Sequence, residues 1–187
     1  MNKLNLLESM GFKVSWKLIN IGLRGHDEIP MLLNHDDVID YLENLLSSNN
    51  KQIDDIVSLI CSKDNPSEFN RRIATLASND RTFMVLQKRK WRVYLLKNTI
   101  DNISKDYLQG ILELMEFWAS MGIPNDCPQT FPSSDNAQSV QEYFTQSSYK
   151  LRINENCAWA CKEVCSIVEL EKEQGDSSLT PPSVDQN

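Results

Sequence analysis

Apolar residues recur at intervals of three and four positions along most of the chain, which is the pattern of amphipathic helices. The clearest segments are residues 38–46, 53–60, 69–77, 107–118 and 153–171. No segment shows the two-residue alternation of a half-buried strand. We therefore predict an all-α fold, a single-domain helical bundle or helical-hairpin array of about seven to nine helices.

Residues 80–103 form the longest apolar stretch without glycine or proline. At about 100° per residue, its apolar side chains fall on two opposite arcs of a helix. A helix that is apolar on two sides needs neighbours on both, so we place it at the centre of the fold. Its expected core residues are Phe83, Trp91, Val93, Leu95 and Leu96.

The other expected core positions are Trp16, Trp118 and two cysteines of the last helix, Cys161 and Cys165. With Cys157, these cysteines recur every four residues and share one helix side. The spacing lacks the paired CxxC of zinc modules, so we interpret it as a buried apolar stripe rather than a metal site. An odd total of five cysteines favours free thiols in a reducing cytoplasm.

The boundaries follow from composition. Residues 1–172 are expected to form one helical domain, and residues 173–187, rich in serine, proline and acids, a flexible tail. No run approaches the roughly 20 apolar residues of a membrane helix, and the first residues do not resemble a signal peptide. We expect a cytoplasmic protein without membrane contact.

The chemistry of catalysis is not evident in this chain. It has two histidines, no phosphate-binding loop and no nucleophile placed beside a base. We therefore expect no catalytic residues, no cofactor and no metal, and interpret the chain as a binding protein.

Charge is unevenly distributed along the chain. Residues 63–99 carry nine basic and three acidic side chains, whereas the segments on both sides are acidic and the net charge is −7. Folding the acidic segments around the basic one neutralises it internally and leaves an acidic surface, which repels nucleic acid and attracts basic proteins. Two alternatives stay open: an RNA-associated helical protein that uses Arg89, Lys90, Trp91 and Arg92, and a non-enzymatic scaffold.

The candidate contacts for a basic partner are acidic side chains on the predicted helix surfaces and around the proline-rich loop 123–136. They are Asp36, Asp37, Asp40, Glu43, Asp54, Asp55, Glu113, Glu116 and Asp126.

Three sequence elements resemble a family of all-helical bacterial proteins. The first is Ser15-Trp16 followed by Ile19 and Gly22, and the second is Lys90-Trp91. The third lies between Glu113 and Pro132, with members Glu116, Trp118, Pro124, Asp126 and Pro132. The segment 122–126 departs from the family's more acidic and aromatic form, and the cysteine-rich last helix is outside the resemblance.

The resemblance implies an immunity protein of a polymorphic toxin system, such as contact-dependent growth inhibition. Such a protein binds the toxin domain of its own strain's effector in the cytoplasm and blocks its active site. Many of these toxins are RNases that act on tRNA, and a basic nuclease domain fits an acidic inhibitor. The expected partner is thus a cognate toxin domain, with no direct contact to nucleic acid.

Overall fold

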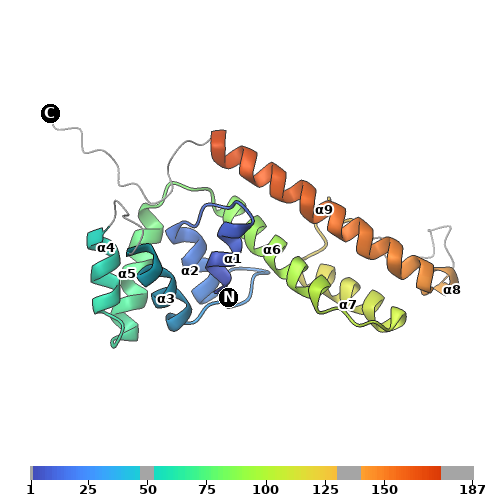
Figure 1. The fold of residues 1–187 in the computed structure, drawn as a ribbon, viewed down its shortest axis with the longest axis horizontal. Helices are drawn as coiled ribbons and strands as arrows, with labels where there is room; N and C mark the ends of the chain where they lie inside the picture. Colours follow the sequence, from blue (N-terminus) through green and yellow to red (C-terminus); the bar gives the residue numbers. More distant parts are fainter. Residues whose placement is uncertain (1, 47–52, 130–139, 174–187) are drawn as a thin grey trace. The chain divides into compact units, whose positions relative to one another are not determined.

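The computed structural model describes residues 2–46, 53–129 and 140–173. Over these residues the chain forms nine α-helices and no strand, which confirms the all-α prediction (Figure 1). The helices are α1 (Lys3–Ser9), α2 (Trp16–Arg24), α3 (His35–Leu46), α4 (Ile53–Cys61), α5 (Pro66–Asn79), α6 (Met84–Asp101), α7 (Tyr107–Ser120), α8 (Val140–Tyr143) and α9 (Gln146–Glu173).

The chain divides into two compact units. The first unit contains Met1–Trp91 together with Ile167–Asn187, and the second contains Arg92–Ser166. The boundaries therefore fall inside two helices, α6 and α9. The expected single domain of residues 1–172 stays a prediction, and residues 174–187 of the expected tail lie outside the described residues.

Side-chain caps fix where several helices begin. The Ser15 hydroxyl accepts a hydrogen bond from the Leu18 amide at the start of α2, as its position in the sequence predicts. Pro66 occupies the first turn of α5, where its missing N–H costs nothing. The central helix begins at Met84 rather than near residue 80. Instead, the Asp80 carboxylate accepts from the backbone amides of Lys17 at 2.9 Å and Thr82 at 2.8 Å, which keeps this segment in a loop.

The core of the first unit forms where α2 meets the start of α6. Trp91 is fully buried and its indole N–H donates to the Leu18 carbonyl at 2.9 Å. A Cβ atom at Gly22 would lie 2.6 Å from both Trp91 and Leu33, so only glycine allows this close approach. The first two sequence elements of the resemblance thus meet at one packing contact.

The core of the second unit joins α7 to α8 and α9. The buried Trp118 indole donates to the Asn156 side-chain oxygen at 2.6 Å, and its ring packs edge-on against Trp159 at 4.9 Å. Ile111, Tyr143 and Tyr149 form a second cluster. Aromatic side chains from three helices therefore hold this unit together.

The expected core residues divide into two groups. Trp16, Trp91, Val93, Leu96 and Trp118 are buried, and Leu95 is half-buried. Phe83, Cys161 and Cys165 were expected in the core, and this prediction is wrong. Phe83 is 64% exposed because it precedes the first turn of α6, and both cysteines are exposed.

The cysteines are exposed because α9 turns a mostly polar stripe inward. This stripe contains the buried side chains of Arg152, Asn156, Glu163, Ile167 and Glu171. Two of these groups, Asn156 and Glu171, have partners far away in the sequence, Trp118 and Lys90, which offsets the cost of burying them. The outer side of α9 is therefore left to Cys157, Cys161 and Cys165.

Candidate partner-binding surface

The central lysine of the basic run of α6 is buried and does not contribute to a cationic surface. Lys90 is fully buried, and its ammonium donates to Glu171 at 2.5 Å, the Lys13 carbonyl at 2.7 Å and the Gln87 side chain at 2.8 Å. All three ammonium hydrogens therefore have acceptors. Burial lowers the pKa of Lys90, and the Glu171 carboxylate opposes this shift.

A second lysine of the run is also paired within the first unit. The Lys88 ammonium lies 2.9 Å from the carboxylates of both Asp27 and Glu28. Partial burial disfavours the charged lysine, but these two hydrogen bonds outweigh it and raise the pKa of Lys88. Arg89 and Arg92 are half-buried. The run thus holds acidic segments of its own chain, and this organisation weighs against the RNA-binding alternative.

Acidic side chains, by contrast, line the exposed side of α3. Asn34 and Asp37 cap the helix reciprocally: the Asn34 side chain accepts from the Asp37 amide at 2.7 Å, and the Asp37 carboxylate accepts from the Asn34 amide at 3.0 Å. The helix then places Asp36, Asp40 and Glu43, spaced by four and three residues, on its exposed side. The opposite side is buried through Val38, Ile39, Tyr41 and Leu42.

The neighbouring helix α4 adds two exposed acids. It packs against α3 and α5 through the buried residues Ile56 and Leu59, and its first turn exposes Asp54 and Asp55. We call the exposed set Asp36, Asp40, Glu43, Asp54 and Asp55 the acidic surface of the first unit. The two candidate groups, which are separated in the sequence, thus lie on helices that pack against each other.

Three other candidate acids are engaged in structural hydrogen bonds. Asp37 caps α3 and forms an ion pair with Lys3 at 3.2 Å. Glu113 accepts from the Ser104 amide at 2.9 Å, and Asp126 accepts from the Trp159 indole at 3.0 Å. Because these carboxylates already hold parts of the fold, they are weaker candidates for contacting a partner.

The candidates in the second unit form a smaller group. Glu116 and Asp126 are exposed, whereas Glu113 is half-buried. The proline-rich loop is described only as far as Gln129, so residues 130–136 lie outside the described residues. Glu113, Glu116 and Asp126 belong to the second unit, and the other six candidates to the first.

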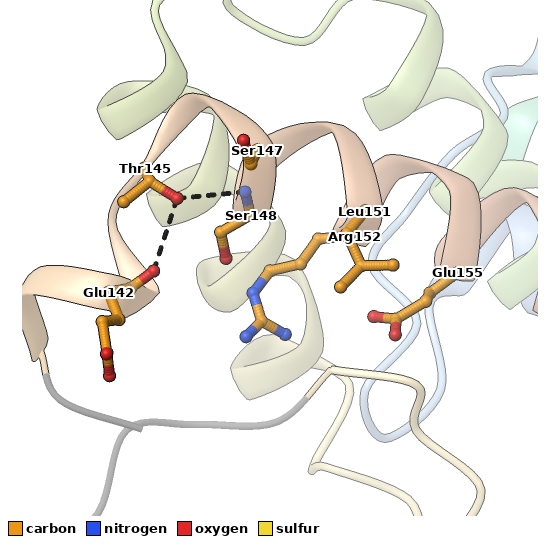
Figure 2. A pocket seen from close by; sticks show the side chains of 7 residues that line it. All are labelled: Glu142, Thr145, Ser147, Ser148, Leu151, Arg152 and Glu155. Atoms are coloured by element: carbon orange, nitrogen blue, oxygen red, sulfur yellow. Dashed lines mark hydrogen bonds between the residues drawn. The ribbon is translucent and has the colours of Figure 1, made fainter. Parts of the chain in front are cut away.

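A pocket of about 360 Å³ lies beside the first turns of α9 (Figure 2). Arg152 enters it with its guanidinium 3.9 Å from the centre of the Tyr143 ring, and the buried Ser148 hydroxyl has no hydrogen-bond partner among the described residues. Glu142 and Glu155 add two carboxylates to the lining. Because acidic and basic groups line it together, the pocket selects neither an anion nor a cation, and the acidic surface of the first unit is the better candidate.

Three of the exposed cysteines lie along α9, yet they do not form a metal site. The described residues contain no group of three or more histidine, cysteine or acidic side chains arranged to hold a metal ion. Within the same residues, no helix combines the length and apolar character needed to cross a membrane.

The exposure of an apolar side of α4 was not predicted from the sequence. The helical period assigns Ile53 and Val57 to the same buried face as Ile56, but they are 48% and 42% exposed. With the exposed Cys61 they are spaced by four residues, so they follow one side of the helix. This regular spacing is visible in the sequence, but the period alone does not tell which apolar arc faces the core.

The fold and surface define the class: an all-helical protein with exposed acidic side chains on the packed helices α3 and α4. The model of the family described as "Uncharacterized protein conserved in bacteria (DUF2247)" matches residues 4–159, and the chain belongs to this family. No curated protein and no solved structure matches the chain. The match includes Lys90 but ends before Glu171, the residue that neutralises it.

Proposed function

We propose that this protein is a cytoplasmic immunity protein that binds and neutralises the basic toxin domain of a contact-dependent growth inhibition or related system. The observation that carries the proposal is the opposite placement of the two kinds of charge. Lys88 and Lys90 pair with carboxylates of their own chain, whereas Asp36, Asp40 and Asp54 are exposed on adjacent helices. The protein therefore presents acids outward.

The chemistry of the partner follows from this surface. A nuclease that acts on tRNA must attract phosphates, so its active site is lined with lysine and arginine. An acidic inhibitor covers the same groups, and the opposite charges steer the two proteins together. The inhibitor needs no catalytic residue of its own. Membership in a family conserved in bacteria agrees with this role, although the family description does not name a partner.

The decisive experiment is protection of growth. The C-terminal domain encoded by the gene immediately upstream is expressed in a host cell with and without this protein. We expect the domain to arrest growth and this protein to restore it. An upstream gene without a toxic domain, or a toxic domain that this protein does not neutralise, would contradict the proposal.

The electrostatic part of the proposal has its own measurement. The variant Asp36→Asn/Asp40→Asn/Glu43→Gln removes three charges while keeping the shape of each side chain. We expect the association rate of the wild-type protein with the toxin domain to fall steeply with salt, and that of the variant to depend on salt much less. A wild-type rate that does not change with salt would refute electrostatic steering.

The RNA-binding alternative is tested with the same purified protein. A cationic RNA site on α6 predicts filter binding of tRNA at low salt that weakens as salt rises. We expect no such binding, because Lys90 is buried and Lys88 is paired. Neither growth protection nor tRNA binding is expected of a scaffold, so the two assays together separate all three functions.

A further inference from the structure

Helix α4 exposes a row of apolar side chains that the described residues leave uncovered. Ile53 and Val57 are 48% and 42% exposed, and Cys61 continues the row one turn later. The core-facing side of the same helix is formed by Ile56 and Leu59, which are essentially inaccessible. We call Ile53, Val57 and Cys61 the apolar stripe of α4.

The stripe is bordered by an acid on one side. At about 100° per residue, Asp54 lies about 60° around the helix from Val57, whereas Asp55 lies about 160° from Val57, on the far side of the helix. Both carboxylates are exposed. Figure 1 shows α4 beside α3 and α5 in the first unit, and the packed neighbour α3 exposes Asp36 and Asp40. An apolar centre with a charged rim is the usual organisation of a protein interface.

The charge of the rim decides what can cover the stripe. A second copy of this chain, docked through the same helix, would bring the Asp54 carboxylates of both copies to one small interface, and such like-charge contacts are unfavourable. Residues 174–187 of the chain carry two acidic and no basic side chains, so the negative charge of this segment also disfavours contact beside Asp54. The stripe therefore fits a segment that is apolar on one side and basic beside it.

We infer that α4 is the docking helix for a basic amphipathic segment of the toxin domain. Apolar side chains of that segment pack on Ile53, Val57 and Cys61, while its lysines or arginines face Asp54. The identity of the partner rests on the proposed function. The inference adds the location of the contact and its apolar centre, where the residues that dominate binding are usually found.

Cys61 gives a direct test, because it lies in the stripe and has a free thiol. The protein is treated with N-ethylmaleimide alone and in complex with the upstream-encoded toxin domain, and labelling of each cysteine is followed by mass spectrometry. The exposed Cys157, Cys161 and Cys165 on α9 serve as internal controls. We expect the complex to slow labelling of Cys61 by at least about tenfold, while labelling of the controls stays within about twofold.

A matched pair of variants tests the same contact through affinity. Val57→Arg places a cation in the stripe, and Val85→Arg makes the same change at a valine that is 70% exposed on α6. We expect the first to weaken toxin binding by at least about 30-fold and the second by less than about threefold. Circular dichroism of both variants checks that the helices are intact.

The outcomes separate this inference from the proposed function. A complex in which Cys61 is labelled at the free rate, or in which both arginine variants bind equally, overturns docking on α4 and leaves the immunity function standing. Absence of a complex, together with absence of growth protection, overturns both. Protection of Cys61 combined with selective loss of binding in Val57→Arg supports the inference.

Discussion

Glu171 neutralises the most deeply buried charge of the first unit, and its removal gives the sharpest stability prediction. One carboxylate oxygen accepts from the Lys90 ammonium at 2.5 Å, and the other accepts from the Lys13 amide at 3.1 Å. Glu171→Ala leaves a buried cation with only neutral acceptors and a backbone amide without its acceptor. Breaking a buried ion pair in this way costs about 3–5 kcal/mol. This is a large part of the roughly 5–15 kcal/mol that stabilises a typical domain.

The measurement is equilibrium unfolding in urea, followed by tryptophan fluorescence and by circular dichroism to test for a single transition. Glu169→Ala is the matched control, because Glu169 is an exposed acid on the same helix. The double variant Lys90→Met/Glu171→Ala removes both charges and is expected to cost less than Glu171→Ala alone. If Glu171→Ala costs less than about 1 kcal/mol, or no more than Glu169→Ala, the buried ion pair does not stabilise the fold as argued.

Two further predictions concern the same unit. Gly22→Ala is expected to destabilise the protein by about 1–3 kcal/mol, because the new methyl group overlaps Trp91 and Leu33; an unchanged melting temperature would contradict this packing. Burial, with the hydrogen bond of its hydroxyl to Glu8, raises the pKa of Tyr41 above its usual value of 10.0. The pKa of Tyr41 is higher in the folded protein than in the unfolded chain, so the stability that its protonated form contributes is complete below pH 10 and is lost as pH rises further. Tyr41→Phe should therefore flatten the alkaline decline in stability. An equally steep decline in the variant would refute the assignment.

Much of the fold could be predicted from local sequence signals. Ser15 caps α2 and Pro66 begins α5 as expected, because capping depends on residues within one turn of each other. Phe83 was predicted wrongly because the loop before α6 is held by Asp80 through hydrogen bonds to Lys17, a contact between residues distant in the sequence. Local periodicity carries no information about such partners.

The last helix shows the same limit more strongly. Its apolar period favours Cys161 and Cys165 as core, but the side that is buried contains Asn156 and Glu171. These polar groups are stable inside because Trp118 and Lys90, on other helices, supply their hydrogen bonds. Which face a helix buries thus depends on partners that only the folded chain brings together.

The candidate surface was predictable in part. Charge counts locate acids on both sides of the basic run, but they do not separate exposed Asp36 and Asp40 from Asp37, which caps its helix and binds Lys3. Capping residues and contact residues have the same chemistry, so only the geometry distinguishes them.

The discontinuity of the first unit has a consequence for synthesis of the protein. Lys90 leaves the ribosome well before Glu171, because the whole second unit is translated between them. At about 5–20 residues per second, roughly 4–16 s pass between the synthesis of Lys90 and that of its counterion Glu171. A nascent chain that ends before Glu171 lacks the carboxylate that accepts a hydrogen bond from Lys90, so the first unit closes only after the second unit has been translated.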